Sequence, residues 1–171
     1  VEQTLRQRPN YSDARLLLAQ LQINEGNIDA AIESVQAASV ITPNNPVIFF
    51  QLGLMHYSRE QYEETVLAME RAVALSNNYS NARYFLGLSH YWLGRPTIAI
   101  EQFEIIEQLN PENQEVKSIL KNMREGRDPF TGQTAQIPPT DPEPDITELE
   151  ELPIEENDPV LEATSDDVVG E

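Results

Sequence analysis

A period of 34 residues constrains the fold of this chain more than any other feature of its sequence. When the sequence is shifted by that length against itself, residues of similar size and polarity coincide at many positions. The columns in register are Leu18, Leu52 and Leu86; Ala19, Gly53 and Gly87; Ala31, Thr65 and Ala99; Val35, Met69 and Phe103; Ala38, Ala72 and Ile106; and Ile41, Leu75 and Leu109. Because one shift satisfies all these columns, the chain is built from repeats of one supersecondary unit.

Each repeat contains two segments of helical periodicity with a helix breaker between them. The breakers are Gly26, Arg59-Glu60 and Gly94, and glycine suits the left-handed residue that follows a helix. Helix starts are expected at the N-cap residues Ser12 and Ser80 and at Pro46, Pro96 and Pro111 in first turns. The sequence therefore predicts helices at 12–24, 28–41, 46–58, 62–76, 80–93, 97–109 and 112–125. The expected fold is all-α, a solenoid of antiparallel helix pairs.

Small residues recur where the two helices of a pair have to approach closely. They are Ala19, Gly53 and Gly87 on the first helices and Ala31 and Ala99 on the second. This pattern resembles the tetratricopeptide-repeat (TPR) family, whose signature is matched best by Leu86-Gly87, Ala99, Phe103 and Pro111. The sequence departs from that signature at the Trp column (Arg15, Phe49, Arg83) and at the Tyr column (Gln22, His56, His90).

Three parts of the chain are expected to differ in organisation. Residues 1–9 resemble the end of an upstream repeat that is truncated here, which makes the chain a fragment. Residues 10–126 form about three full repeats followed by an amphipathic C-terminal capping helix. Residues 127–171 contain seven of the twelve prolines and fourteen acidic residues beside the single base Arg127, so this acidic tail is predicted to be disordered and to add nothing to folding.

Composition excludes several classes of function. The net charge of −18 argues against a nucleic-acid partner, which needs clustered Lys and Arg. The absence of cysteine removes thiolate catalysis and Cys-ligated zinc, and no apolar run approaches the ~20 residues that span a bilayer. His56 and His90 lie one period apart without a third ligand or a nucleophile, so neither a metal, a cofactor nor catalysis is expected. Compartment and oligomeric state are not indicated.

The TPR resemblance implies a concave peptide-binding groove lined by positions 2, 5, 9 and 12 of each repeat. Carried over to positions 5, 9 and 12, the expected groove residues are Leu16, Gln20, Ile23, Phe50, Leu54, Tyr57, Tyr84, Leu88 and Tyr91. Some TPR domains clamp an acidic C-terminus with Lys and Asn at positions 5 and 9, and this sequence has neither there. The predicted partner is therefore an extended or helical apolar segment of a protein or peptide.

Two further hypotheses concern regions beyond the groove. The acidic, Pro-rich end resembles in style the C-terminal TPR region of some bacterial O-antigen ligase-like or polymerase-like membrane proteins, whose chemistry would lie in a missing, membrane-anchored part. Assembly through uncapped solenoid ends is another possibility. The four aliphatic residues of segment 146–154 resemble a linear interaction motif, and self-contact of this segment with the groove is one hypothesis for the tail, beside an acidic spacer.

Overall fold

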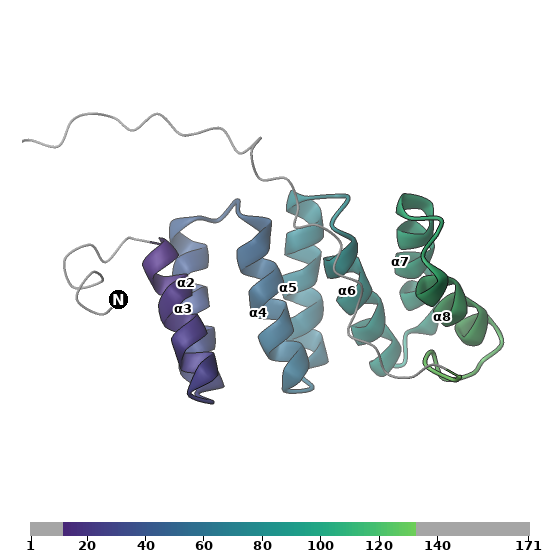
Figure 1. Ribbon diagram of the computed structural model, residues 1–171, viewed down its shortest axis with the longest axis horizontal. Coiled ribbons are helices and arrows are strands. Elements are labelled where there is room, and N and C mark those ends of the chain that lie inside the picture. Colours follow the sequence, from purple (N-terminus) through teal and green to yellow (C-terminus); the bar gives the residue numbers. More distant parts are fainter. Residues whose placement is uncertain (1–11, 133–171) are drawn as a thin grey trace, which may run out of the picture.

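The computed structural model describes residues 12–132, and the predictions made for residues 1–11 and 133–171 lie outside that range. Seven helices follow one another in the described part (Figure 1). They are α2 (Ser12–Asn24), α3 (Ile28–Ile41), α4 (Pro46–Ser58), α5 (Tyr62–Leu75), α6 (Ser80–Trp92), α7 (Pro96–Leu109) and α8 (Gln114–Arg124). The predicted helices are thus confirmed, with ends that differ by one or two residues.

The helix starts correct part of the sequence prediction. Ser80 is the first residue of α6, and Tyr79 holds the N-cap position without a side-chain cap bond. Pro111 lies in the turn before α8 and not in its first turn. Asparagine supplies the side-chain caps instead: Asn27, Asn45 and Asn113 accept hydrogen bonds from the backbone N–H groups of Ala30, Val47 and Val116.

Consecutive helices pack as antiparallel pairs, α2 with α3, α4 with α5 and α6 with α7, and the pairs stack into a row (Figure 1). A Cβ at Gly87 would lie 2.8 Å from Cε2 of Phe103, and one at Gly53 would lie 2.6 Å from Cε of Met69. Both distances are too short for a real side chain. The glycines therefore allow the helices of each pair to approach closely, as the small-residue columns predicted.

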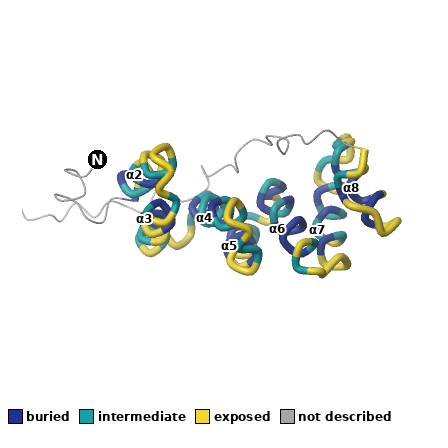
Figure 2. Tube along the Cα trace, turned by 90° about the horizontal axis from the view of Figure 1, so that it is seen from below, coloured by how far each residue is buried: buried dark blue, intermediate teal, exposed yellow. Residues whose placement is uncertain are grey.

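Burial is greatest in α6 (Figure 2). Only Ser12, Ala14 and Ala19 are buried in α2, whereas most residues of α6 are. Part of this burial comes from α8, which packs on α7 and adds Val116, Ile119 and Leu120 to the hydrophobic cluster that contains Tyr84 and Leu88. Within the part of the chain that the structure describes, no helix has the length and apolar character needed to cross a membrane.

The ordered chain continues past the predicted boundary at residue 126. Pro129 is buried, and Phe130 packs against the cluster of the third repeat. The buried Asn122 side chain on α8 donates hydrogen bonds to the carbonyl oxygens of Pro129 (3.0 Å) and Thr131 (2.9 Å) and accepts one from Arg127 (2.9 Å). Residues 127–132 therefore pack with the solenoid and are not part of a separate tail. The sequence missed this because it offers no periodicity after α8.

The turn between the helices of each pair needs one residue in the left-handed region. Gly26 (φ 77°), Glu60 (φ 59°) and Gly94 (φ 71°) occupy equivalent positions in successive repeats. A residue with a Cβ is strained by roughly 1–2 kcal/mol in this conformation. The turn that contains Glu60 is therefore the least favourable of the three turns.

Replacing this glutamate by glycine is expected to stabilise the protein. Removing the backbone strain should stabilise the folded protein by more than the extra conformational entropy of glycine stabilises the unfolded chain. We therefore expect Glu60→Gly to raise the free energy of unfolding by about 0.5 kcal/mol. The converse substitution Gly94→Ala meets no neighbouring atom, so its loss of about 1 kcal/mol would come from the backbone alone. Thermal unfolding followed by circular dichroism measures both. A destabilised Glu60→Gly protein would show that the glutamate side chain has another role.

Candidate functional site

An open groove lies between the first helices of the first and second repeats. Helices α4 and α6 approach each other closely along their backbones, but α2 and α4 do not. The space between α2 and α4 has a volume of about 550 Å³, within the usual range for ligand sites. Its lining residues are Leu16, Ala19, Gln20 and Ile23 from α2; Val47, Phe50, Gln51, Leu54 and Met55 from α4; and Tyr79 and Asn81 from the start of α6.

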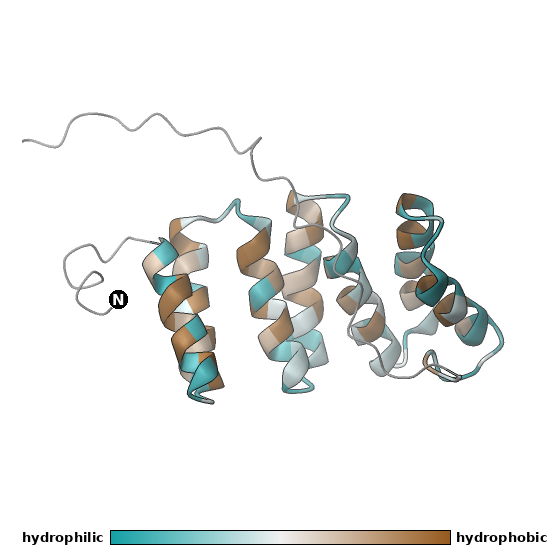
Figure 3. Ribbon diagram, viewed as in Figure 1, coloured by the Kyte–Doolittle hydropathy of each residue, from teal (hydrophilic) through white to brown (hydrophobic). Residues whose placement is uncertain are grey.

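The groove is lined mainly by apolar side chains, with three carboxamides among them. Its half-buried aliphatic and aromatic side chains come from both walls. Gln20, Gln51 and Asn81 contribute carboxamides, which both donate and accept hydrogen bonds. No Asp, Glu, Lys or Arg lines the groove. The sequence of α4 contains none of them, and much of this helix is coloured hydrophobic in Figure 3.

Phe50 gives the α4 wall a fixed position. Its ring centroid lies 4.9 Å from that of the buried Tyr79 and 6.1 Å from that of Phe85, both in tilted geometry. Such ring contacts add to the stability gained from burial. The wall is therefore formed before any ligand arrives.

The nine predicted groove residues fall into two groups. Leu16, Gln20, Ile23, Phe50 and Leu54 line the groove. Tyr84 and Leu88 are buried in the cluster of the third repeat, which Tyr57 and Tyr91 also contact. Their binding role stays a prediction, but Tyr84 and Leu88 are not surface residues in this structure.

Helix α8 is the physical reason for that burial. The Tyr84 hydroxyl donates a 2.7 Å hydrogen bond to the Glu115 carboxylate of α8. Burial first, and then this carboxylate, raise the pKa of Tyr84 far above its ordinary value. Tyr84 would face a ligand if the third repeat were uncovered, but here it faces the capping helix α8.

Sequence reasoning also missed part of the lining. Val47 and Asn81 stand at position 2 of their repeats, so the same register would have found them. Gln51, Met55 and Tyr79 lie outside the four groove positions, and no signal in the sequence marked them. They line the groove because α2 and α4 stand apart.

Charge is distributed unevenly between the two helix layers. The first helices of the repeats carry only Asp13, Arg15 and Arg83. The second helices each carry two or three acidic residues, which are Asp29, Glu33, Glu63, Glu64, Glu70, Glu101, Glu104 and Glu107, against the single base Arg71. An acidic ligand is therefore repelled from the second-helix layer and not from the groove.

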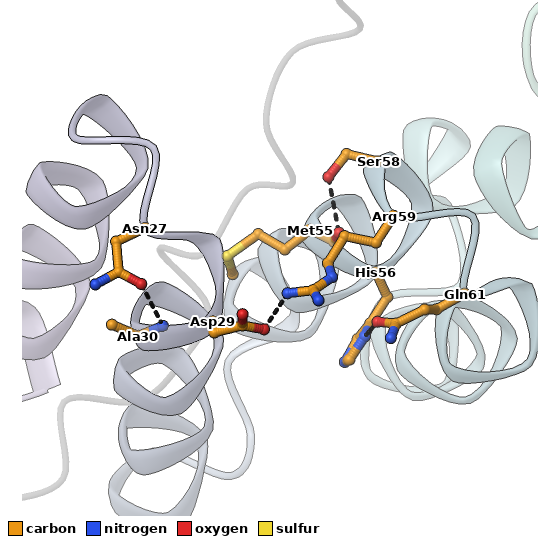
Figure 4. Close-up of polar contacts among 8 residues, drawn as sticks. All are labelled: Asn27, Asp29, Ala30, Met55, His56, Ser58, Arg59 and Gln61. Carbon is orange, nitrogen blue, oxygen red and sulfur yellow. Dashed lines mark hydrogen bonds and ion pairs between the residues drawn. The ribbon is translucent and has the colours of Figure 1, made fainter.

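The surroundings of the two histidines indicate a structural role for both. His56 Nδ1 lies 2.8 Å from Oε1 of Gln61, the N-cap residue that precedes α5 (Figure 4). In the next repeat Arg95 replaces that glutamine, and Nδ1 of the buried His90 has no hydrogen-bond partner among the described residues. Within residues 12–132, no three His, Asp or Glu side chains gather as metal ligands would.

This difference between repeats predicts a pH effect. Burial, and next the positive charge of Arg95, lower the pKa of His90. Because the unfolded chain takes up a proton near pH 6.5 that folded His90 resists, stability is expected to fall as the pH drops below about 6.5.

Arg95→Gln restores the pairing seen at His56 and Gln61 and removes the repelling charge. It is expected to raise both the melting temperature and the pKa of His90, measured by thermal unfolding and by NMR titration of the imidazole. Gln61→Arg in the second repeat is the matched control: it removes the partner of His56 and should lower the melting temperature. An unchanged His90 pKa would contradict this explanation.

Comparison with known proteins identifies the repeat. A family model described as tetratricopeptide repeat matches residues 1–49. The solved structure of MamA superposes with a TM-score of 0.68 at 26% identity, covering 73% of this chain and 73% of that one. The chain contains tetratricopeptide repeats.

Other TPR structures share the fold at lower identity. The first TPR of Spaghetti (RPAP3), solved bound to the HSP90 peptide SRMEEVD, gives a TM-score of 0.62 at 20% identity, covering 67% of this chain and 91% of that one. The N-terminal domain of stress-induced protein-1 from C. elegans gives 0.62 at 14% identity, covering 66% and 94%. No curated protein sequence matches this TPR chain. The chain is thus similar to peptide-binding TPR domains.

Proposed function

We propose that this TPR protein is a non-catalytic scaffold that binds an extended, apolar peptide segment of another protein in the groove between α2 and α4. The observation that carries the proposal is the groove itself, an uncovered apolar channel lined by no charged residue. Burying such a surface against an apolar partner is favourable by roughly 25 cal/mol per Å². The likeness to TPR domains solved with peptides supports a peptide as the ligand.

The carboxamides favour an extended ligand over a helical one. A helix satisfies its own backbone groups, whereas an extended peptide presents N–H and C=O groups along its length. Gln20, Gln51 and Asn81 can bond to both kinds of group. The aliphatic and aromatic walls then accept alternate side chains of the bound segment.

The lining also indicates which peptides the groove rejects. Two carboxylates at a peptide C-terminus need cationic partners, and no Lys or Arg lines this groove. The peptide SRMEEVD, which is bound by the RPAP3 domain, should therefore not bind here. An uncharged apolar peptide should.

Selection from a displayed library of random peptides tests the proposal with the full chain as bait. Peptides with apolar residues at alternating positions are expected to be enriched. Leu54→Asp and the milder Gln20→Glu, both inside the groove, should weaken their binding by about tenfold, which corresponds to roughly 1.4 kcal/mol. Leu67→Asp and Gln36→Glu, at exposed positions of second helices, are the matched controls. Equal effects of groove and control variants would overturn the proposal.

Segment 146–154 lies outside the described residues, and its self-contact with the groove stays a prediction. In the full chain it would compete with a selected peptide, because tethering gives an effective concentration on the order of millimolar. Leu149→Asp combined with Leu152→Asp would then tighten binding of that peptide. The resemblance to TPR regions of membrane ligases or polymerases also stays a prediction and is compatible with the same groove.

A further inference from the structure

Four aromatic side chains form a continuous surface away from the α2–α4 groove. We call Tyr57, Tyr62, Tyr91 and Trp92 the aromatic row. Ring centroids are 5.7 Å apart for Tyr57 and Tyr62, 6.2 Å for Tyr62 and Trp92, and 5.2 Å for Tyr91 and Trp92. The row joins the ends of α4 and α6 with the start of α5.

The row is rigid and partly uncovered. Trp92 Nε1 donates a 3.3 Å hydrogen bond to the Tyr57 hydroxyl, and the Trp92 and Tyr62 rings are stacked at an interplanar angle of 24°. Trp92 nevertheless remains 44% exposed. A preformed aromatic surface of this kind loses little side-chain entropy when a partner covers it, which is why Trp and Tyr dominate binding surfaces.

The chemistry of the row suits a proline-rich segment. Polyproline II segments have no internal hydrogen bonds and dock their rings against Tyr and Trp side chains. We propose that the aromatic row binds the proline-rich segment of this chain, residues 138–144, whose sequence is Pro-Pro-Thr-Asp-Pro-Glu-Pro. This inference is independent of the groove between α2 and α4.

The position at which the described chain ends supports this occupant. Helices α4, α6 and α8 run in the same direction, so the row and residues 125–132 lie along one edge of the molecule (Figure 1). Phe130 packs against the same hydrophobic cluster as Tyr57 and Tyr91. Pro138 follows Gly132 by six residues, which span about 20 Å when extended. This length equals roughly two interhelical packing distances, so these six residues can reach back across two neighbouring helices.

Arg95 is the cation that favours the same pairing. It directly precedes α7, at the turn that follows Trp92, whereas Arg59 after α4 is already paired with Asp29. Asp141, Glu143 and Asp145 alternate with prolines in and beside the segment. Glu60, Glu63 and Glu64 flank Tyr62 in the sequence and repel the segment at that end of the row.

The only tryptophan of the chain is Trp92, so its indole N–H gives a single NMR peak that reports on the row. In the full chain, replacing Pro138, Pro139, Pro142 and Pro144 by alanine is expected to move this peak. The matched control replaces Pro153 and Pro159 and should leave it in place. Adding a free peptide of residues 136–146 to the four-proline variant should return the peak toward its original position.

A second measurement detects proximity. Because the chain has no cysteine, Thr140→Cys accepts one spin label, and this label should broaden the Trp92 indole peak. A tethered site with a Kd on the order of millimolar is about half occupied, so we expect the four-proline variant to lose about half of the broadening. Broadening that the variant leaves unchanged would reflect tethering alone and would overturn the proposal. So would an indole peak that neither the variant nor the peptide moves.

Discussion

Gly87→Leu is expected to lower the free energy of unfolding by about 2–3 kcal/mol, the largest loss for a single substitution in the second or third repeat. Even a Cβ at this position would lie 2.8 Å from the Phe103 ring, which is fully buried and cannot move aside. The gain in helix propensity, about 1 kcal/mol, offsets only part of this overpacking. The melting temperature should fall by roughly 10 °C.

Gly53→Leu is the matched control because it occupies the same column one repeat earlier. Its Cβ would meet Cε of Met69, the far end of a flexible side chain that can change rotamer. We expect about half of the loss seen at Gly87. His90→Ala, one turn along α6, removes a buried ring without forcing helices apart and should cost less than Gly87→Leu. Equal losses at both glycines, or a larger loss at His90, would contradict the proposed close packing.

Truncating the chain before segment 128–132 should destabilise the protein, whereas truncating it after this segment should not. Ending the chain at residue 127 removes the buried Pro129 and Phe130 and leaves Asn122 without its two carbonyl partners. Apolar burial and an unsatisfied buried amide together cost about 3 kcal/mol, so the melting temperature should fall by roughly 10 °C.

Ending the chain at residue 132 keeps every one of these contacts. The melting temperature should then stay within about 3 °C of that of the full chain, a change below that expected for 1 kcal/mol. Asn122→Ala in the full chain checks the cause and should reproduce a large part of the loss. If both truncations melted alike, residues 128–132 would not be docked as described.

The repeat made most of the fold predictable from sequence. A helix pair that recurs with one period can bury its apolar side only against the next pair, so the helix ranges and close-packing glycines followed from register alone. Glycine at the turns supported the boundaries. The N-cap prediction was wrong where the local sequence does not follow the repeat, as at Tyr79 before α6.

The candidate site was less predictable because it depends on how far apart the repeats stand. Position within a repeat identified Leu16, Phe50 and Leu54 as groove residues. The same reasoning placed Tyr84 and Leu88 on that surface, although α8 buries them. Whether a position faces a ligand or the next helix depends on how the repeats stack on one another. The sequence of a single repeat does not contain that information.

Peptide binding in the groove between α2 and α4 is the central claim, and backbone NMR of the full chain with a selected apolar peptide tests it most directly. We expect the largest chemical-shift changes at residues of α2 and α4 that line the groove, around Leu16, Gln20, Phe50 and Leu54. Tyr84 and Leu88 should change little, because α8 already covers them. Changes centred on α6 and α8, or no change with any selected peptide, would contradict the claim.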